Sequence, residues 1–544
     1  MLNWLKRWLD RRSYGGAPAA APPPKEPQQT SALGAQLSAR PDDAELNYRM
    51  GLEQFCAGDA AAALDYFHLA LHYAPAMFSA CAARAQALAA LQRHADAAEA
   101  YREFLRANPG HPGAAYALAA WHHGRGEHEE ALALLRPLAE LRPVQRDACN
   151  LLGLILAREL GCFAEGERLL RRALEPDPQW PVALSNLGWI LMEKGDYARG
   201  LELLDAVLER DPEDQETRLA RGYMKLKHRE FAQGWRDFEA RHHSRHAAAQ
   251  NRDWERWDGA PMPGKTLLIR GEQGLGDQIM FASCFSDAIR RSERCIIECN
   301  PKLLRLFQRS FPGAAVRAQP AAAGDAALPE RLPDVDRQIP MGSLPGLFRR
   351  SEAEFPRHAG YLRAAPERIA YWRSRLDELG PGPKIGVSWR GGIATTRRHL
   401  RSFALEEFLP VLRQPARCVS LQYGHCGAEL GALARDHGVV LPHWQDALDD
   451  YDETAALVCA LDLVVSVCTA VIHLSGALGR PVWVLVPAIA EWRYLDRGET
   501  LPWYPSARLF RQAAPGPWHD LIADVAAECG RFAAGFSGSD PRRP

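Results

Sequence analysis

The first half of the chain repeats its pattern of apolar and polar positions every 34 residues. Pro75, Pro109 and Pro143 stand 34 residues apart, as do Ala63 and Ala97. Within each period, apolar residues follow the spacing of two amphipathic helices, and a period of this length indicates helix pairs stacked in a solenoid. A small residue recurs near the start of each period, at Gly51, Ala85, Ala119, Gly153, Gly188 and Gly222.

Small residues let the two helices of a pair approach closely, and the prolines end each second helix. These positions resemble the tetratricopeptide repeat, and six repeats are expected over residues 41–246. Such a solenoid usually offers a concave groove to a protein or peptide, although it can also be only a rigid arm. The last repeat is rich in aromatic residues between Phe231 and Arg241, so we expect it to dock on the next domain of the chain.

Beyond residue 260 the pattern changes to short β-branched runs that alternate with glycine turns and helical stretches. This alternation predicts two doubly wound α/β domains, at 264–370 and 383–535. Strands are expected at 265–270, 295–298, 384–389, 418–422, 461–467 and 481–486, helices at 277–291 and 452–460, and an irregular region at about 312–345.

The run from Ser466 to Pro481 reads as a βαβ corner suited to an anion. Thr469 can cap a helix from Ala470 to about Leu478, and the strands on either side should be parallel. The free amides at the start of that helix would face the carboxyl edge of the sheet, where a phosphate binds favourably. The alternatives are that Thr469 only caps the helix and that His473 only lies on its surface.

A second glycine turn, Gly271-Glu-Gln-Gly-Leu-Gly-Asp277, follows the strand at 265–270. Gly274 and Gly276 would let the backbone approach a ligand, and the spacing is not that of a dinucleotide fingerprint. Asp277 stands at the start of the next helix. It is either an N-cap or a carboxylate placed to act as a general base.

The loop at 390–402 gathers Arg390, Arg397, Arg398 and Arg401 after a strand. Guanidinium groups on a glycine-containing loop suit phosphate binding, whereas a solvated loop is the alternative.

The composition of the chain limits the classes of function that it can have. A net charge of -1 and a pI near 7 give no electrostatic case for nucleic acid. Twelve scattered cysteines without a CxxC pair favour reduced thiols and a cytoplasmic location. Cys295 and Cys299 could supply half of a metal site, but the sequence shows no matching Cys/His pair, so no metal is expected. A second cluster consists of His242, His243 and His246, and we expect these side chains to be exposed to solvent.

The amino end, residues 1–40, is expected to be a short basic amphipathic helix at 1–12 followed by an Ala/Pro linker. Leucine and tryptophan on one face and basic residues on the other would allow a weak contact with a membrane surface or a partner. A frayed terminus without function is the alternative. No apolar stretch long enough to span a bilayer stands out in the sequence.

The two glycine motifs, together with Ile385-Gly-Val-Ser-Trp389 and Arg401-Ser402, resemble the bacterial heptosyltransferase-like glycosyltransferases, in the version fused behind tetratricopeptide repeats. The resemblance implies a GT-B fold of two Rossmann-like domains, a nucleotide-sugar donor as substrate, no metal or other cofactor, and inversion at the sugar carbon. It implies that Asp277 is the base. It implies donor contacts at Gly274, Gly276, Arg397, Arg398, Arg401, Cys468, Thr469, Ala470, Val471 and His473, although heptosyltransferases often carry Asp where this chain has Cys468.

The sequence therefore predicts a glycosyltransferase that moves a sugar to an acceptor hydroxyl, on a protein or peptide held by the repeats. The alternative is a non-catalytic tetratricopeptide scaffold whose α/β region is structural or senses a nucleotide.

Overall fold

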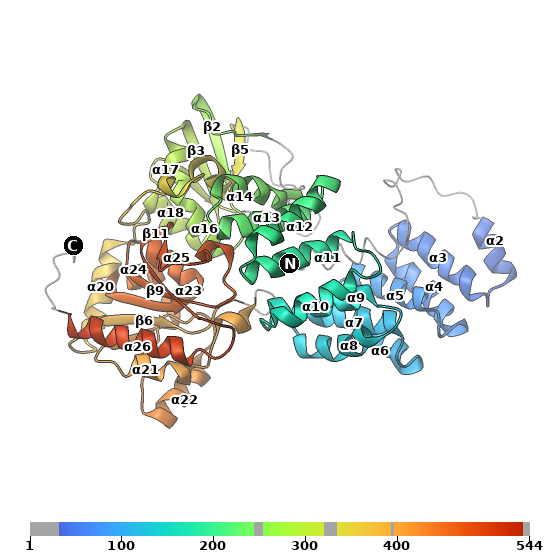
Figure 1. The fold of residues 1–544 in the computed structure, drawn as a ribbon. Coiled ribbons are helices and arrows are strands. Elements are labelled where there is room, and N and C mark those ends of the chain that lie inside the picture. Colours follow the sequence, from blue (N-terminus) through green and yellow to red (C-terminus); the bar gives the residue numbers. More distant parts are fainter. Residues whose placement is uncertain (1–31, 244–253, 320–333, 393–396, 537–544) are drawn as a thin grey trace. The chain divides into compact units, whose positions relative to one another are not determined.

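The computed structural model describes residues 32–243, 254–319, 334–392 and 397–536, which form two compact units, residues 1–194 and 195–544 (Figure 1). The predicted helix at 1–12, most of the linker and His246 lie outside the described residues. The linker prediction is wrong at its end, because residues 32–39 form a helix.

The first unit consists of helices alone among its described residues. Asp43 and Asp59 cap two of these helices by accepting backbone N–H groups, as expected of aspartate at an N-cap. A Cβ on Gly51 would come within 2.5 Å of the Phe67 ring, which explains the small residue there. The helices are α2 (Ala32–Ala39), α3 (Ala44–Cys56), α4 (Ala60–Tyr73), α5 (Phe78–Ala90), α6 (His94–Ala107), α7 (Pro112–Arg125), α8 (His128–Glu140), α9 (Arg146–Arg158), α10 (Phe163–Ala173) and α11 (Pro181–Glu193).

The second unit opens with three more repeat helices, α12 (Tyr197–Arg210), α13 (Gln215–Lys227) and α14 (Phe231–Phe238), followed by the 3₁₀ turn η1 (Glu239–His243). They continue the alternation of helices that begins at α3, so that the described residues of the two units contain twelve repeat helices, α3 to α14. The predicted docking of the last repeat is confirmed. Trp235 is buried, its indole N–H donates to the Arg349 carbonyl at 2.8 Å, and its ring packs edge-on against Trp492 and Trp503.

The first sheet has the order β1-β5-β2-β3-β4, and all its neighbouring strands are parallel. The region predicted to be irregular supplies two of these strands, β4 and β5, so that prediction is wrong there. The helix predicted at 277–291 begins at Leu275 and is interrupted at Ala282. The elements are β1 (Glu255–Arg256), β2 (Met262–Arg270), α16 (Leu275–Phe281), η2 (Ala282–Cys284), α17 (Phe285–Ile289), β3 (Ser292–Cys299), η3 (Pro301–Leu303), α18 (Leu304–Ser310), β4 (Ala315–Ala318), β5 (Arg337–Pro340), η4 (Met341–Ser343), α19 (Pro345–Phe348) and η5 (Glu352–Glu354).

The second sheet has the order β10-β11-β9-β8-β6-β7, parallel except for the β10–β11 pair. The βαβ prediction is confirmed, because β8 and β9 pair in parallel on either side of α25. The elements are α20 (Pro366–Asp377), β6 (Lys384–Ser388), η7 (Arg398–Arg401), η8 (Leu405–Phe408), α21 (Leu409–Leu412), β7 (Arg417–Ser420), α22 (Gly427–His437), α23 (Gln445–Asp449), α24 (Tyr451–Ala460), β8 (Leu463–Val467), α25 (Ala470–Ala477), β9 (Val482–Val486), η9 (Trp492–Tyr494), β10 (Thr500–Leu501), β11 (Tyr504–Arg511) and α26 (His519–Ala534).

Two of the cysteines lie in the apolar core of the second unit. Cys295 and Cys299 both lie on β3 within the apolar cluster of the second unit, and burial raises the pKa of each to about 12. Among the described helices, none is both long enough and apolar enough to cross a membrane.

Candidate functional site

The two glycine motifs, which lie almost 200 residues apart, meet at the amino ends of α16 and α25. A Cβ on Gly276 would lie 2.9 Å from His473 Cδ2 and 3.5 Å from Ala470 Cα. Any side chain at this position would therefore push the two helices apart. The absence of a side chain at Gly276 thus permits the close contact between the helices, and the predicted backbone contact with a ligand stays a prediction.

Asp277 is not the N-cap of α16. Gly274 is the N-cap, and Asp277 stands in the first turn with its Oδ2 atom 3.4 Å from the Gly274 amide, which donates to it. The other oxygen, Oδ1, accepts from Nη2 of Arg493 at 2.6 Å. The Asp277 side chain is 20% exposed and that of Arg493 15%, so this ion pair is shielded from water but open on one side.

Arg493 continues a chain of alternating charges. Its other terminal nitrogen contacts Glu491, whose Oε1 atom lies 3.1 Å from Nη1 of Arg401. Burial by itself would lower the pKa of Arg493, but the Asp277 carboxylate more than compensates and raises it. The chain of Asp277, Arg493, Glu491 and Arg401 thus carries two negative and two positive groups, with the partly exposed Asp277 at one end and Arg401 at the other.

Sequence reasoning missed Arg493 and Glu491. They lie in the segment Glu491-Trp-Arg-Tyr494, whose aromatic residues are buried and whose arginine makes the contact with Asp277. The sequence feature that could have identified them is a pair of opposite charges in an otherwise apolar segment after a strand.

The arginine loop is held in place by a buried amide. Gln422 Oε1 accepts from the backbone N–H of Trp389 at 3.1 Å and of Arg390 at 2.8 Å. Arg390 Nε lies 3.1 Å from a carboxylate oxygen of Glu429, so its charge serves the fold. This anchor fixes the start of the loop just beyond β6.

The predicted arginine clamp is only partly assembled. Arg401 points to Glu491 and joins the charge chain, whereas Arg398 is exposed and Arg397 is half-buried in a left-handed conformation at φ 56°. Residues 393–396 lie outside the described residues. Of the three predicted arginines, Arg401 is therefore the one that is linked to Asp277, through Glu491 and Arg493.

The capping role of Thr469 is confirmed, because its side chain accepts from the Val471 amide at 3.3 Å. His473 is neither on the helix surface nor open to a donor. It is 4% exposed, with Nδ1 3.0 Å from the Tyr504 hydroxyl and Nε2 3.5 Å from the Tyr494 hydroxyl. Burial, with Arg493 and Arg401 nearby, holds its pKa well below the usual value, so the ring is neutral and structural.

Cys468 also turns inward, which corrects its expected donor contact. The thiol is 2% exposed and lies 3.6 Å from the Leu485 carbonyl, and burial raises its pKa to about 11. Val471 is buried as well, whereas Ala470 is partly exposed. The side chain at 470 and the backbone at the amino end of α25 are thus what this corner can offer to a ligand.

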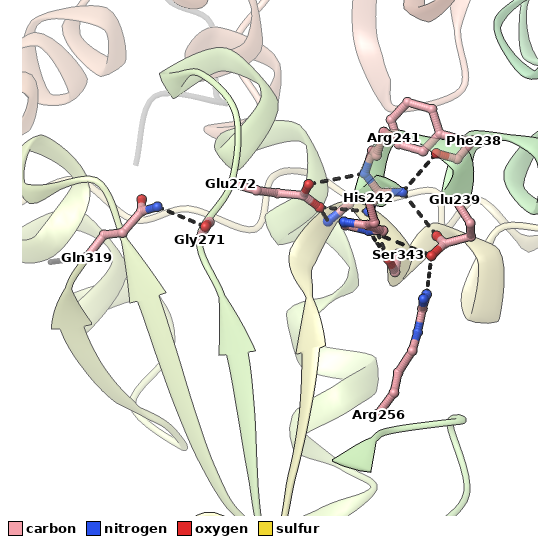
Figure 2. A network of polar contacts seen from close by, with 10 residues as sticks. Phe238, Glu239, Arg241, His242, Arg256, Gly271, Glu272, Gln319 and Ser343 are labelled. Carbon is pink, nitrogen blue, oxygen red and sulfur yellow. Dashed lines mark hydrogen bonds and ion pairs between the residues drawn. The ribbon is translucent and has the colours of Figure 1, made fainter. Parts of the chain in front are cut away.

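The turn that carries Asp277 is tied to the last repeat by a polar network (Figure 2). Glu272 receives two hydrogen bonds from Arg241, at 2.8 and 3.1 Å, and one from the Gly342 amide at 2.7 Å. His242 also contacts Ser343, at 3.3 Å, and is largely buried, so the expectation of a solvated histidine is wrong for this residue. The network fixes the strand-to-helix turn from outside the sheet, and it joins residues that no local sequence pattern connects.

The repeats and the two parallel sheets define the class of molecule: a helical repeat array joined to an α/β module. Tetratricopeptide repeat models match residues 48–112, 82–144 and 157–222, so the N-terminal region consists of tetratricopeptide repeats. Protein FlbA of Caulobacter vibrioides (strain ATCC 19089 / CIP 103742 / CB 15) is 29% identical over 456 residues, which cover 80% of this chain and 76% of that protein. The match to FlbA therefore extends well beyond the repeats.

Among solved structures, YrrB, described as a TPR protein with an unusual peptide-binding site, is 20% identical and covers 35% of this chain and 97% of its own, with a TM-score of 0.28. TTC0263, a TPR protein of Thermus thermophilus, is 23% identical and covers 34% and 99%, with a TM-score of 0.28. PilW, described as a type IV pilus biogenesis factor, is 21% identical and covers 38% and 89%, with a TM-score of 0.30.

Proposed function

We propose that this chain is a glycosyltransferase of the GT-B type, which moves a sugar from a nucleotide-sugar donor to an acceptor hydroxyl. The observation that carries the proposal is the position of Asp277. It lies beyond the carboxyl end of β2, on the helix that packs against the amino end of α25, in contact with Arg493, which is linked through Glu491 to Arg401. In open parallel sheets, ligands bind beyond the carboxyl ends of the strands, and a phosphate there is favoured by helix amides and guanidinium groups.

In this proposal, Asp277 acts as the general base. The acceptor oxygen attacks the anomeric carbon, its proton passes to the Asp277 carboxylate, and the bond from that carbon to the diphosphate breaks with its electron pair on the phosphate oxygen. Attack opposite the leaving group inverts the sugar carbon. Charge that grows on the diphosphate is stabilised by Arg401, Arg493 and the amino end of α25, so the reaction needs no divalent ion.

The donor would also change the ion pair at the base. In the present structure Arg493 donates to Asp277 at 2.6 Å and so engages an oxygen that could take the proton. A diphosphate offers the guanidinium a more highly charged partner. Donor binding would thus draw Arg493 from Asp277 and leave the base free for the acceptor.

We further propose that the acceptor is a protein or peptide bound by the repeats. Tetratricopeptide arrays generally bind such partners, and a groove supplies binding energy that a single hydroxyl cannot.

The second candidate function is a scaffold without catalysis. It is favoured by the same ion pair and by His473, which lies buried between two tyrosines where a donor contact was expected. In this case the charge chain only stabilises the packing of α16 on α25.

A screen of nucleotide-sugar donors distinguishes the transferase function from the scaffold function. The full-length protein is incubated with nucleotide sugars of different base and sugar, and release of nucleotide diphosphate is measured with and without a chelator. Transferase function predicts release with at least one donor, unchanged by the chelator. No release and no thermal stabilisation by any donor would contradict it and favour the scaffold.

The requirement for the repeats is tested by a deletion that follows the compact units. Removing residues 41–194 leaves the second unit whole, whereas a cut at 246 would strip Phe231, Trp235 and Phe238 from the apolar core. The shorter deletion should keep donor hydrolysis and lose transfer to a protein acceptor. Full transfer without residues 41–194 would contradict a role for the first unit in acceptor binding.

A further inference from the structure

Helices α12, α13 and α14 enclose a polar groove in the second unit. The cavity has a volume of about 520 Å³. Arg218, Arg221 and Lys225 follow one face of α13 at helical spacing, with Asp205 on one side and Arg236 on the other. None of these residues belongs to the charge chain around Asp277.

The charges in this groove do not balance. Arg221 is paired with Asp205 and Asp237, each at 2.7 Å. Within the described residues, Arg218, Lys225 and Arg236 have no carboxylate within 4.0 Å, and Glu209 is the one acidic residue of the lining left to offset them. The groove therefore carries a surplus of positive charge in a chain whose net charge is -1.

Lys225 is the cation of the groove whose burial is least favourable. It is 6% exposed, and its ammonium group donates to the side-chain oxygen of Gln233 at 2.6 Å, a neutral partner. A buried cation without a counter-charge is unfavourable, and a bound carboxylate would remove that cost. This side chain gives the groove a reason to bind an anion that exposed arginines alone would not give.

The groove also lies close to the candidate base. The α13 helix packs against η9, which carries Arg493, and the Asp496 amide donates to the Lys227 carbonyl at 3.1 Å. One helix therefore separates the groove from the charge chain, a thickness of about 10 Å.

We propose that this groove binds an acidic segment of the protein acceptor, with its carboxylates at Lys225, Arg218 and Arg236. The inference rests on the proposed function for the identity of the partner. The binding of acidic peptide is measured independently of turnover.

The experiment uses the full chain and a fluorescein-labelled oligoglutamate peptide, followed by fluorescence polarisation. We expect binding that weakens as salt is added, because the contacts are ionic. The variant Arg218→Ala/Arg236→Ala should bind about tenfold more weakly, the loss expected for two partly exposed ion pairs. The control variant Arg199→Ala/Arg435→Ala removes two exposed arginines outside the groove and should bind as the wild type does.

Arg236→Glu changes an exposed residue and so keeps the test independent of folding; it should weaken binding further. Nucleotide diphosphate binding, measured by thermal shift, should be the same in all variants, which separates this inference from the donor site. Three results would overturn it: no binding of oligoglutamate, equal binding of oligolysine or of oligothymidylate, or equal losses in the groove and control variants.

Discussion

Replacing Asp277 by asparagine separates catalysis from structure at a single residue. The side chain keeps its size, and its single oxygen can still accept from Arg493 or from the Gly274 amide, which in the wild type donate to different oxygens of Asp277. What is lost is the negative charge. The variant therefore tests whether the carboxylate takes a proton or only holds a guanidinium.

The cost in stability follows from the burial of the pair. Breaking a fully buried ion pair by removing one partner costs about 3–5 kcal/mol. Here Glu491 still faces Arg493, both side chains of the pair are partly exposed, and the amide oxygen retains a hydrogen bond. A charge-assisted bond becomes a neutral one, so we expect a loss of about 1–2 kcal/mol.

The cost in rate should be larger. Without a base, the acceptor hydroxyl keeps its proton as the anomeric bond breaks, and transfer should slow by about 10²- to 10⁴-fold. A stability loss of about 2 kcal/mol leaves the protein folded, because domains are stable by about 5–15 kcal/mol. The fall in kcat is thus not explained by unfolding.

The matched variant is Arg493→Gln, which breaks the same ion pair and leaves the carboxylate. It should lose a similar amount of stability and, as a phosphate ligand is removed, some of the rate. Because its base is intact, it should keep the acidic limb of the pH profile of kcat/KM, which Asp277→Asn should lose.

The measurements are the free energy of unfolding in urea, kcat and the pH profile for the wild type, both single variants and the double variant. Near-normal kcat in Asp277→Asn refutes the catalytic assignment. A loss of rate that leaves the acidic limb in place would assign Asp277 to the ion pair alone.

Three further predictions concern packing and pH. Gly276→Ala should destabilise the second unit by about 1–3 kcal/mol, because the added methyl group would lie 2.9 Å from His473. The control is Gly427→Ala, which should not destabilise the protein because the space around Gly427 is open. Equal urea midpoints for the two variants would count against the close contact at Gly276. Trp235→Ala should cost about 3–5 kcal/mol through the cavity left beneath the last repeat, and a loss below about 1 kcal/mol in urea unfolding would show that the repeat is not part of this core. Burial lowers the pKa of His242 to about 4, so the folded state stays neutral there while the unfolded chain gains a proton below about pH 6.5. Stability is therefore full above that pH and should fall by about 2 kcal/mol from this group between pH 7 and 5, and His242→Gln should flatten the pH dependence; an unchanged slope would contradict the assignment.

The repeat array was predictable because its information is local. Each helix pair is specified within one period by small residues where helices touch and by prolines where they end, and the structure contains the twelve helices that six repeats require. The β8–α25–β9 corner was predictable for the same reason, since a β-branched run, a capping threonine and a second run lie within about 25 residues.

Short strands were not predictable in this way. β4 and β5 have four residues each, too few for an alternating pattern to be recognised. They become strands because β3 and β2 offer unpaired backbone groups in register.

Part of the candidate site could be predicted from the sequence, and part is visible only in the tertiary structure. The sequence determined that glycine turns and an aspartate follow parallel strands, because strand, turn and helix are neighbours along the chain. Only the tertiary structure decided that Arg493, 216 residues from Asp277, is its partner, and that His473 and Cys468 face the interior. An ion pair or a buried ring forms only where the surfaces of two distant elements meet. Side-chain packing in three dimensions determines which surfaces meet, and the spacing of residues along the chain does not encode it.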